Sequence, residues 1–318
     1  MEAKSKGLSS RSIALLASGL IGAVLLASLV APSLIKLPPF AHPCVAVIKI
    51  EGVLASSQDY TFLTPQVGVE EYIKLLDKAR EDPHIKAVVL YVNSPGGTIW
   101  ASEDLYFKVI ELCKSKVTLA YVDGYCTSGA YMAILPVKKI LTSNSSIIGS
   151  IGVCMVLVNF NGLLGKIGVK VLTFKSGRLK DIGSPFRNIT DEDRRIYEDL
   201  IKGLFRVFKE RVLKYRTNLV NKSEIFEGRP YTAYEARRLG LIDGVTTLNY
   251  AINLAKKMAG LPSNTPVEYL KPARKGLLST ILRSYIRLTG NYAPNIEILA
   301  LWPPPSPTFT ILELLTKG

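Results

Sequence analysis

The fold of this chain is decided by one stretch, Tyr121-Val122-Asp123-Gly124-Tyr125-Cys126-Thr127-Ser128-Gly129-Ala130-Tyr131. An apolar run over residues 117–122 leads into it, and its β-branched residues predict a buried strand. After Gly129 the sequence is apolar again, which predicts a core helix or strand. Ser128 is therefore expected at a sharp turn after the strand, where Gly124 and Gly129 let the backbone bend tightly and approach a ligand closely.

A serine at such a turn has two interpretations. It can cap the following helix through its hydroxyl, which is its commoner role. It can also be a nucleophile, because backbone N–H groups at a helix start are placed to hold a developing oxyanion. Gly97 leaves a similar choice open, between an ordinary turn and an N–H directed at a substrate carbonyl.

Strand-like and helix-like segments alternate along the chain. The expected strands are residues 45–50, 85–92, 117–122, 139–142, 154–158 and 169–175, and the expected helices are residues 69–80, 100–113, 190–215 and 250–259. This alternation predicts an α/β fold with right-handed crossovers. Gly97, Ser128 and Lys180 each follow an expected strand, and ligands of such sheets bind at the carboxyl ends of the strands.

Composition narrows the class of protein. The chain has 318 residues, of which 48% are hydrophobic, and a formal net charge of +14. A positive charge of this size is typical of proteins that bind nucleic acid or an anionic membrane surface. The sequence has no nucleic-acid-binding motif and no dense basic block, so the charge is interpreted as serving a membrane surface or simple solubility. Membrane lipids, and no nucleic acid, are the expected partners. The four cysteines are widely spaced, which predicts neither a zinc site nor a disulfide framework, and no cofactor is expected.

The N-terminal segment has the features of a membrane anchor. Residues 12–31 are uncharged and apolar over about the twenty residues that a bilayer requires. Basic residues precede them, which predicts a cytoplasmic N-terminus and an extracytoplasmic catalytic domain at the cell membrane. A cleaved signal peptide is the alternative. The expected divisions are a cytoplasmic segment 1–11, an anchor 12–35, a linker 36–44, a catalytic domain 45–260 and a C-terminal extension 261–318.

The extension differs in composition from the domain before it. Residues 276–288 are apolar with interspersed arginines, which is typical of an amphipathic helix. Such a helix can pack on the domain or lie at a membrane surface, where basic charge favours it. Both interpretations stay open.

A serine nucleophile needs a base, and histidine is poorly supplied. The chain has two histidines, His42 in the linker and His84 before an expected strand, and both are interpreted as solvated loop residues. The remaining arrangement is a serine–lysine pair. Lysine acts as a base near neutral pH only where burial or a neighbouring cation favours its uncharged form. Composition does not identify which lysine that is.

Several further motifs occur in order along the chain: Val92-Asn93-Ser94-Pro95-Gly96-Gly97, the stretch 123–131, Gly149-Ser150-Ile151-Gly152-Val153, Phe174-Lys175-Ser176-Gly177-Arg178-Leu179-Lys180-Asp181, and two later segments at 226–232 and 236–243. Taken together, they resemble the signal peptide peptidase A family, the membrane-anchored serine proteases of family S49. The resemblance covers residues 45–248. It implies a crotonase/ClpP-like fold and a Ser-Lys dyad.

By motif, the resemblance assigns Ser128 as nucleophile and Lys180 as general base. It assigns the N–H groups of Gly97 and Gly129 to the oxyanion hole, and Ser176 as a support for Lys180. Single-domain relatives of this kind assemble into rings in which serine and lysine come from neighbouring subunits. A homo-oligomeric ring is therefore expected.

The resulting hypothesis is a membrane-anchored serine endopeptidase that hydrolyses hydrophobic peptides such as cleaved signal peptides. Three alternatives stay open. A crotonase-like acyl-CoA enzyme shares the sheet but does not need Ser128 and Lys180 together. A non-catalytic membrane scaffold needs neither residue. A stomatin-associated Ser-Lys protease differs in its substrate and not in its chemistry.

Overall fold

The computed structural model describes residues 42–56, 67–272 and 298–301. The expected anchor at 12–35 and the expected amphipathic segment at 276–288 lie outside these residues. Within the part of the chain that is described, no helix is both long enough and apolar enough to cross a membrane.

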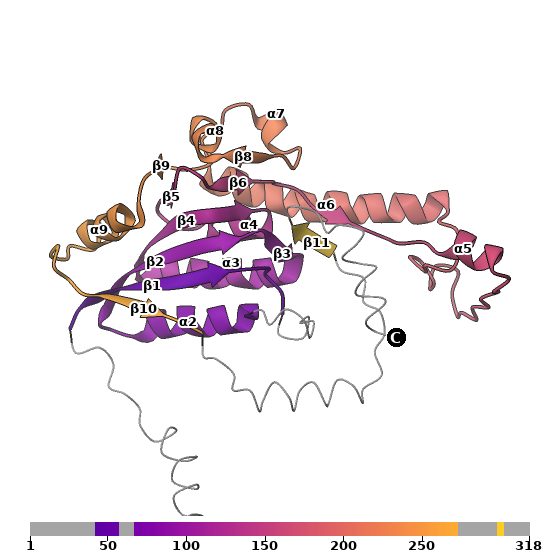
Figure 1. The fold of residues 1–318 in the computed structure, drawn as a ribbon, viewed down its shortest axis with the longest axis horizontal. Helices are drawn as coiled ribbons and strands as arrows, with labels where there is room; N and C mark the ends of the chain where they lie inside the picture. The colour runs from indigo at the N-terminus through magenta and orange to yellow at the C-terminus, as the bar shows by residue number, and fades with distance from the viewer. Residues whose placement is uncertain (1–41, 57–66, 273–297, 302–318) are drawn as a thin grey trace, which may run out of the picture. The chain divides into compact units, whose positions relative to one another are not determined.

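The centre of the domain is a mixed sheet in which almost all strands run parallel (Figure 1). Its strand order is β10-β1-β2-β4-β5-β9, and β6 branches from β4 and pairs with an antiparallel β8. The expected α/β class is confirmed. The strands are β1 (Cys44–Glu51), β2 (Ile85–Ser94), β4 (Val117–Thr127), β5 (Ile140–Thr142), β6 (Ile147–Gly149), β8 (Pro230–Thr232), β9 (Gly244–Val245) and β10 (Val267–Leu270).

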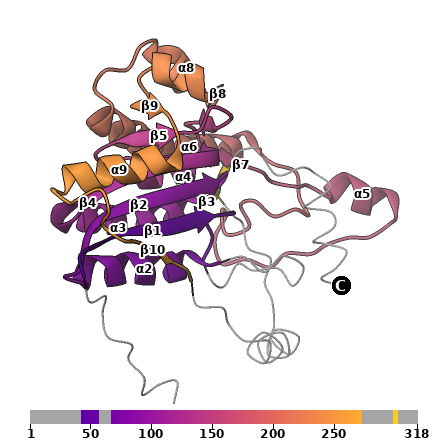
Figure 2. The same cartoon turned by 60° about the vertical axis from the view of Figure 1, so that its left-hand side comes forward.

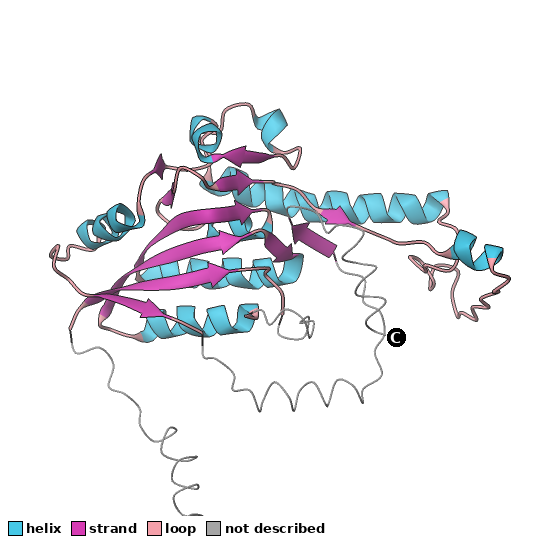
Figure 3. Ribbon diagram, in the orientation of Figure 1, coloured by secondary structure: helices cyan, strands magenta, loops and turns pink. Residues whose placement is uncertain are grey.

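Helices cover both faces of this sheet (Figure 3). On one face, alternate residues of the central strands pack against α9 (Leu248–Met258) through Ala251, Ile252 and Ala255. On the other lie α2 (Val69–Glu81) and α3 (Ile99–Ser115). Because both faces are covered, β1 and β2 are nearly continuous apolar runs, as expected of buried parallel strands.

Strand β4 is longer than the sequence predicts and has two successive neighbours on one side. Its first part, residues 120–122, pairs with β5, and its last part, residues 125–127, pairs with β6. The change occurs at Gly124, which has a φ of +111°. A Cβ there would lie 2.4 Å from Asn93 Oδ1, an atom that accepts a hydrogen bond from the Tyr125 N–H. The close approach requires glycine.

A second, three-stranded sheet lies beside the carboxyl end of β4. It consists of β3 (Gly96–Thr98), β11 (Ile298–Leu301) and β7 (Cys154–Met155), with β11 antiparallel to both neighbours. The sequence predicts a turn at Gly96-Gly97 and a longer strand at 154–158. The structure has a strand at the first and only two strand residues at the second.

Residues 156–190 form an arm that extends from the sheet (Figures 1 and 2). The strand expected at 169–175 is wrong: the segment has no strand, and all seven residues are exposed. Its β-branched residues satisfy the local preference for a strand, but the structure places no neighbouring strand beside it. The arm contains α5 (Asn161–Lys166), and the chain then continues through α6 (Asp191–Tyr215), α7 (Lys222–Ile225) and α8 (Ala233–Arg238).

Candidate active site

Ser128 stands between β4 and α4 (Gly129–Ile134), as the sequence predicts. Its backbone has a φ of +53° and a ψ of −124°, a conformation that costs a non-glycine residue about 1–3 kcal/mol. Its N–H donates to the Gly149 carbonyl at 2.6 Å, and its carbonyl accepts from the Met132 N–H at 3.0 Å. These backbone bonds hold the strained turn in place.

The hydroxyl of Ser128 does not cap the helix, because no side-chain capping hydrogen bond forms. The commoner interpretation of this serine is therefore wrong for the described structure. The residue is only 2% exposed. A buried hydroxyl that takes no part in capping is left for another role.

The residues around Ser128 are buried in the core. Gly129 is buried and is the first residue of α4, so its N–H has no partner within the helix. Tyr131, also in α4, donates a hydrogen bond from its buried hydroxyl to the Leu241 carbonyl at 2.7 Å.

Complete burial raises the pKa of the Cys126 thiol. The raised pKa disfavours the thiolate form that a cysteine nucleophile needs, which argues against Cys126 as a nucleophile.

Gly97 occupies a position that only glycine can fill. A Cβ at this residue would lie 1.7 Å from the Leu54 carbonyl oxygen. Leu54 pairs with this segment: its N–H donates to the Gly96 carbonyl at 2.7 Å, and its carbonyl accepts from the Thr98 N–H at 2.8 Å. The contact with Leu54 therefore fixes β3 in place.

The structure brings the Gly97 segment and the Ser128 turn to the same edge of the sheet. Ser94 and Cys126 are register partners in β2 and β4. Beyond them, the Thr127 hydroxyl donates to the Pro95 carbonyl at 3.0 Å. Sequence reasoning did not single out Thr127 or Asn93 as positioning residues. Each bonds to a residue 32 positions away, so no local pattern marks the pair.

Lys180 and Ser176 lie elsewhere, on the loop between α5 and α6. Lys180 is in a turn, and its N–H donates to the Gly177 carbonyl at 3.1 Å. Both residues are exposed, and among the described residues no hydrogen bond or ion pair joins either of them to Ser128. Because residues 169–175 form no strand, the expectation that Lys180 directly follows a strand end is wrong. Its assignment as the base stays a prediction.

A series of ion pairs fixes this loop to the start of α6. Lys175 Nζ lies 2.8 Å from Asp181, and Arg187 Nε lies 3.2 Å from the same carboxylate. Arg187 also pairs with Asp193, which forms a reciprocal capping box with Thr190. Hydrogen bonds from Lys175 lower the pKa of Asp181, and those from Arg187 and Thr190 lower the pKa of Asp193. The loop that bears Lys180 is thus ordered by its own charges.

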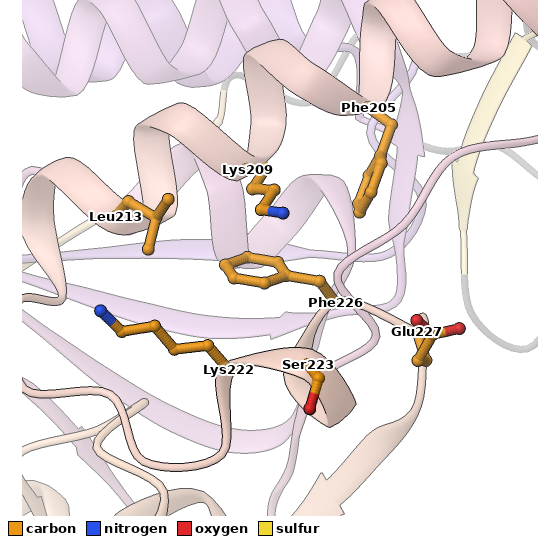
Figure 4. A pocket seen from close by; sticks show the side chains of 7 residues that line it. All are labelled: Phe205, Lys209, Leu213, Lys222, Ser223, Phe226 and Glu227. Carbon is orange, nitrogen blue, oxygen red and sulfur yellow. The ribbon is translucent and has the colours of Figure 1, made fainter.

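Two cavities lie away from Ser128. One of about 290 Å³ lies between α6 and α7, where Lys209 and Phe226 face each other with the ammonium 5.0 Å from the ring centroid (Figure 4). The other, of about 380 Å³, is lined by Met155 of β7 and by residues of α6. Neither cavity is lined by Ser128 or Gly97, so neither is assigned as the active site.

The fold and the site together define a class of protein. It is an α/β protein with a buried serine at a strained strand-to-helix turn, whose hydroxyl does not cap the helix, and with the Gly96-Gly97 strand nearby. Comparison with known proteins agrees. The family model for Peptidase family S49 matches residues 111–262. A provisionally named protease of Methanocaldococcus jannaschii is 41% identical over 207 residues, which are 65% of this chain and 67% of that protein.

Further relatives carry similar names. A provisionally named signal peptide peptidase SppA of Enterococcus faecium is 30% identical over 71% of this chain and 66% of its own length. The chloroplastic serine protease SPPA of Arabidopsis thaliana is 28% identical over 72% of this chain and 34% of its own length. A solved structure of a membrane-bound stomatin-specific protease superposes with a TM-score of 0.43 at 16% identity, over 74% of this chain and all of that one.

This chain belongs to peptidase family S49 and is a serine protease of that family. The resemblance inferred from the motifs is confirmed.

Proposed function

We propose that this protease is a membrane-anchored endopeptidase in which Ser128 is the nucleophile, Lys180 is the general base, and the N–H groups of Gly97 and Gly129 bind the oxyanion. The observation that carries the proposal is the Ser128 hydroxyl, which is buried at a strained turn and not used as a cap. Strain of this kind persists where the surrounding structure maintains it, and it is concentrated at functional sites.

The chemistry follows from the two glycines. Gly129 begins a helix and Gly97 lies on a strand that Thr127 ties to the serine turn. Two backbone donors that converge on one carbonyl oxygen stabilise the tetrahedral intermediate of acyl transfer. The Ser128 oxygen attacks the peptide carbonyl as its proton passes to the base, Lys180. The scissile C–N bond then breaks, the amine leaves with that proton, and an acyl-enzyme ester remains. Water hydrolyses this ester, which releases the carboxylic acid and restores the Ser128 hydroxyl.

The base is proposed to come from a second copy of the chain. In the single chain Lys180 is exposed on the arm, whereas a lysine base requires an environment that favours its neutral form. The arm also exposes large apolar side chains, among them Phe174 at 94% and Leu172 at 79%. Large exposed apolar side chains gathered on one segment support an interface there. Docking of the arm on a neighbouring copy buries this surface and desolvates Lys180, and a closed ring repeats the contact.

The proposed substrates are hydrophobic peptides such as cleaved signal peptides, which are released at the membrane. The apolar run at residues 12–31 supports an anchor there, with the catalytic domain outside the cytoplasm. The name of the Enterococcus faecium relative agrees with this substrate class.

A serine-reactive phosphonate tests the proposal on the detergent-solubilised full chain. We expect the wild type to be labelled at Ser128 and to hydrolyse apolar peptides, and Ser128→Ala to lose both properties. Ser150→Ala is the matched control, because Ser150 also has a positive φ, of 48°, and follows the neighbouring strand β6. This control should keep its label. Wild-type turnover in Ser128→Ala would contradict the assignment, and an acyl-CoA thioesterase or hydratase activity that survives it would favour the crotonase-like alternative.

A further inference from the structure

The smaller of the two cavities, between α6 and α7, has largely apolar walls. Its volume is about 290 Å³, which suits one amino-acid residue better than a long chain. Phe205 and Leu213 line it from α6, and Phe226 lines it from the end of α7. The rings of Phe205 and Phe226 lie edge to face, with their centroids 6.4 Å apart. The cavity is therefore chemically suited to an apolar side chain.

Two lysines complete the lining, one from each helix. Lys209 of α6 lies over the Phe226 ring, with its ammonium 5.0 Å from the ring centroid (Figure 4). Lys222 is the first residue of α7. Both lysines are also exposed, so a ligand that enters from solvent meets their charges.

The two positive charges are not neutralised by the protein. In the part of the chain that the structure describes, neither Lys209 nor Lys222 forms an ion pair, and nearby Glu224 is paired with Arg229. The Glu227 carboxylate stands at the edge of the cavity, apart from both ammonium groups (Figure 4). Ammonium groups bind carboxylates through short, charge-assisted hydrogen bonds. The charge of the cavity therefore complements an anionic group joined to an apolar one.

The cavity is connected to the serine turn by a short path along the chain. Arg229 is three residues after Phe226, and its carbonyl accepts a hydrogen bond from the Ser150 N–H at 3.0 Å. Gly149, the residue before Ser150, accepts the bond from the Ser128 N–H at 2.6 Å. Since three residues span at most about 10 Å, the cavity lies within the length of a short extended peptide from Ser128.

We propose that this cavity binds the free C-terminal carboxylate and the last apolar side chain of a peptide substrate, and so favours cleaved peptides over intact precursors. The proposal rests on the peptidase function proposed above. A peptide released from its precursor ends in a carboxylate, whereas the same segment within the precursor continues as an amide. Lys209 and Lys222 determine this specificity because they pair with the charge, and Phe226 contacts the side chain.

A matched pair of peptides tests the preference on the detergent-solubilised full chain. One apolar peptide carries a free C-terminal carboxylate, and the other is its C-terminal amide. Charge-assisted hydrogen bonds should give wild type a KM about tenfold lower for the acid than for the amide, with equal kcat. Lys209→Gln with Lys222→Gln should raise the KM for the acid to that for the amide and leave kcat unchanged.

Lys214→Gln is the matched control, because Lys214 is also exposed on α6 but does not line the cavity. This variant should keep the preference of about tenfold. N-acetylphenylalanine presents one apolar side chain and one carboxylate, so it should raise the KM for the acid peptide by competition. N-acetylphenylalaninamide lacks the charge and should not.

Equal KM values for the two peptides in wild type would overturn the proposal. A preference that survives in the double variant, or is lost in Lys214→Gln, would do the same. Dodecanoate tests the other source of an apolar carboxylate, since its chain is longer than one residue. If it displaces the acid peptide at a lower concentration than N-acetylphenylalanine does, the cavity is a fatty-acid site and the proposal is wrong.

Failure of the underlying function is distinct, because binding to Ser128→Ala requires no hydrolysis. A fluorescent acid peptide should bind this variant about tenfold more tightly than its amide, and the difference should disappear when Lys209 and Lys222 are replaced. If this difference is found while wild type neither reacts with phosphonate nor hydrolyses peptide, the peptidase function fails and the carboxylate site stands. Equal affinity for the two peptides would remove the site.

Discussion

The Thr127 hydroxyl donates a hydrogen bond of 3.0 Å to the Pro95 carbonyl, and this bond joins the residue before Ser128 to the residue before the glycine pair. Two loops that begin on neighbouring parallel strands are therefore linked at the site. Their relative position decides whether the Gly97 N–H and the Ser128 hydroxyl can act on the same carbonyl. Displacement of about 1 Å in such a site can cost about a hundredfold in rate.

Thr127→Val keeps the shape of the side chain and removes the bond. We expect kcat to fall about ten- to a hundredfold and the free energy of unfolding to fall by about 1–3 kcal/mol, because the Pro95 carbonyl loses a partner. Steady-state kinetics and thermal melts measure the two effects.

Thr142→Val is the matched control, since the Thr142 hydroxyl is buried without a hydrogen-bond partner among the described residues. Its replacement should be neutral or stabilise the protein by about 1 kcal/mol and leave kcat unchanged. Equal kinetic losses in both variants would show that the Thr127 bond has no special role.

Gly97→Ala should disable the site by steric conflict. Its Cβ would lie 1.7 Å from the Leu54 carbonyl oxygen, so β3 has to move. We expect a loss of about 1–3 kcal/mol of stability and a larger loss of kcat than of substrate affinity. Gly203→Ala in α6 is the control, because nothing lies within 4 Å of its added Cβ. This helix substitution should stabilise the chain by about 0.5–1 kcal/mol. Full activity in Gly97→Ala would remove this glycine from the oxyanion hole.

Mixing of inactive chains tests whether the dyad is shared. Ser128→Ala and Lys180→Ala should each lose at least about a thousandfold in kcat. When the two are dissociated, mixed and reassembled, some neighbours present one intact Ser128 and one intact Lys180, so partial activity should return. Mixed oligomers that stay inactive would place both residues in a single chain.

The ion pairs of the arm predict a dependence of stability on pH. The pKa of Asp193 in the folded chain is lowered from its usual 3.8, mainly by its bonds to Arg187, so the carboxylate contributes stability above about pH 4. This contribution is lost as the pH falls below that value. Asp193→Asn should therefore lower Tm at pH 7, and the difference from wild type should narrow between pH 4 and pH 2. A constant difference across that range would exclude the ionised pair as its source.

The parts of the fold predicted from sequence are those with a local cause. Strands β1 and β2 are continuous apolar runs, and the start of α6 is marked by the Thr190 capping box. Strand β3 is not predictable in this way, because Gly96-Gly97 has little preference for a strand and its pairing partners, Leu54 and β11, are distant in the sequence. The segment 169–175 has the local preference but forms no strand, because no strand of the described residues lies beside it.

The same distinction applies to the site. The turn at Ser128 follows from a strand, two glycines and an apolar run, which succeed one another directly in the sequence. The absence of a side-chain cap at Ser128 does not follow, because it goes with backbone angles at this residue that no local sequence pattern reports. The position of Lys180 could not be inferred either, since a predicted strand end was its only structural support.

The change of neighbour along β4, from β5 to β6 at Gly124, has a consequence for local unfolding. The first part of β4 is in the middle of the sheet, where Leu119, Ala120 and Val122 are fully buried, whereas Tyr125 beyond Gly124 is 40% exposed. Gly124 separates the two parts, so the paired strands β6 and β8 can detach without breaking the hydrogen bonds between β4 and β5. Local opening of this kind has its own free energy, below that of global unfolding. Amide exchange should therefore be slower over residues 119–122 than over residues 125–127, the part of β4 that leads directly to Ser128.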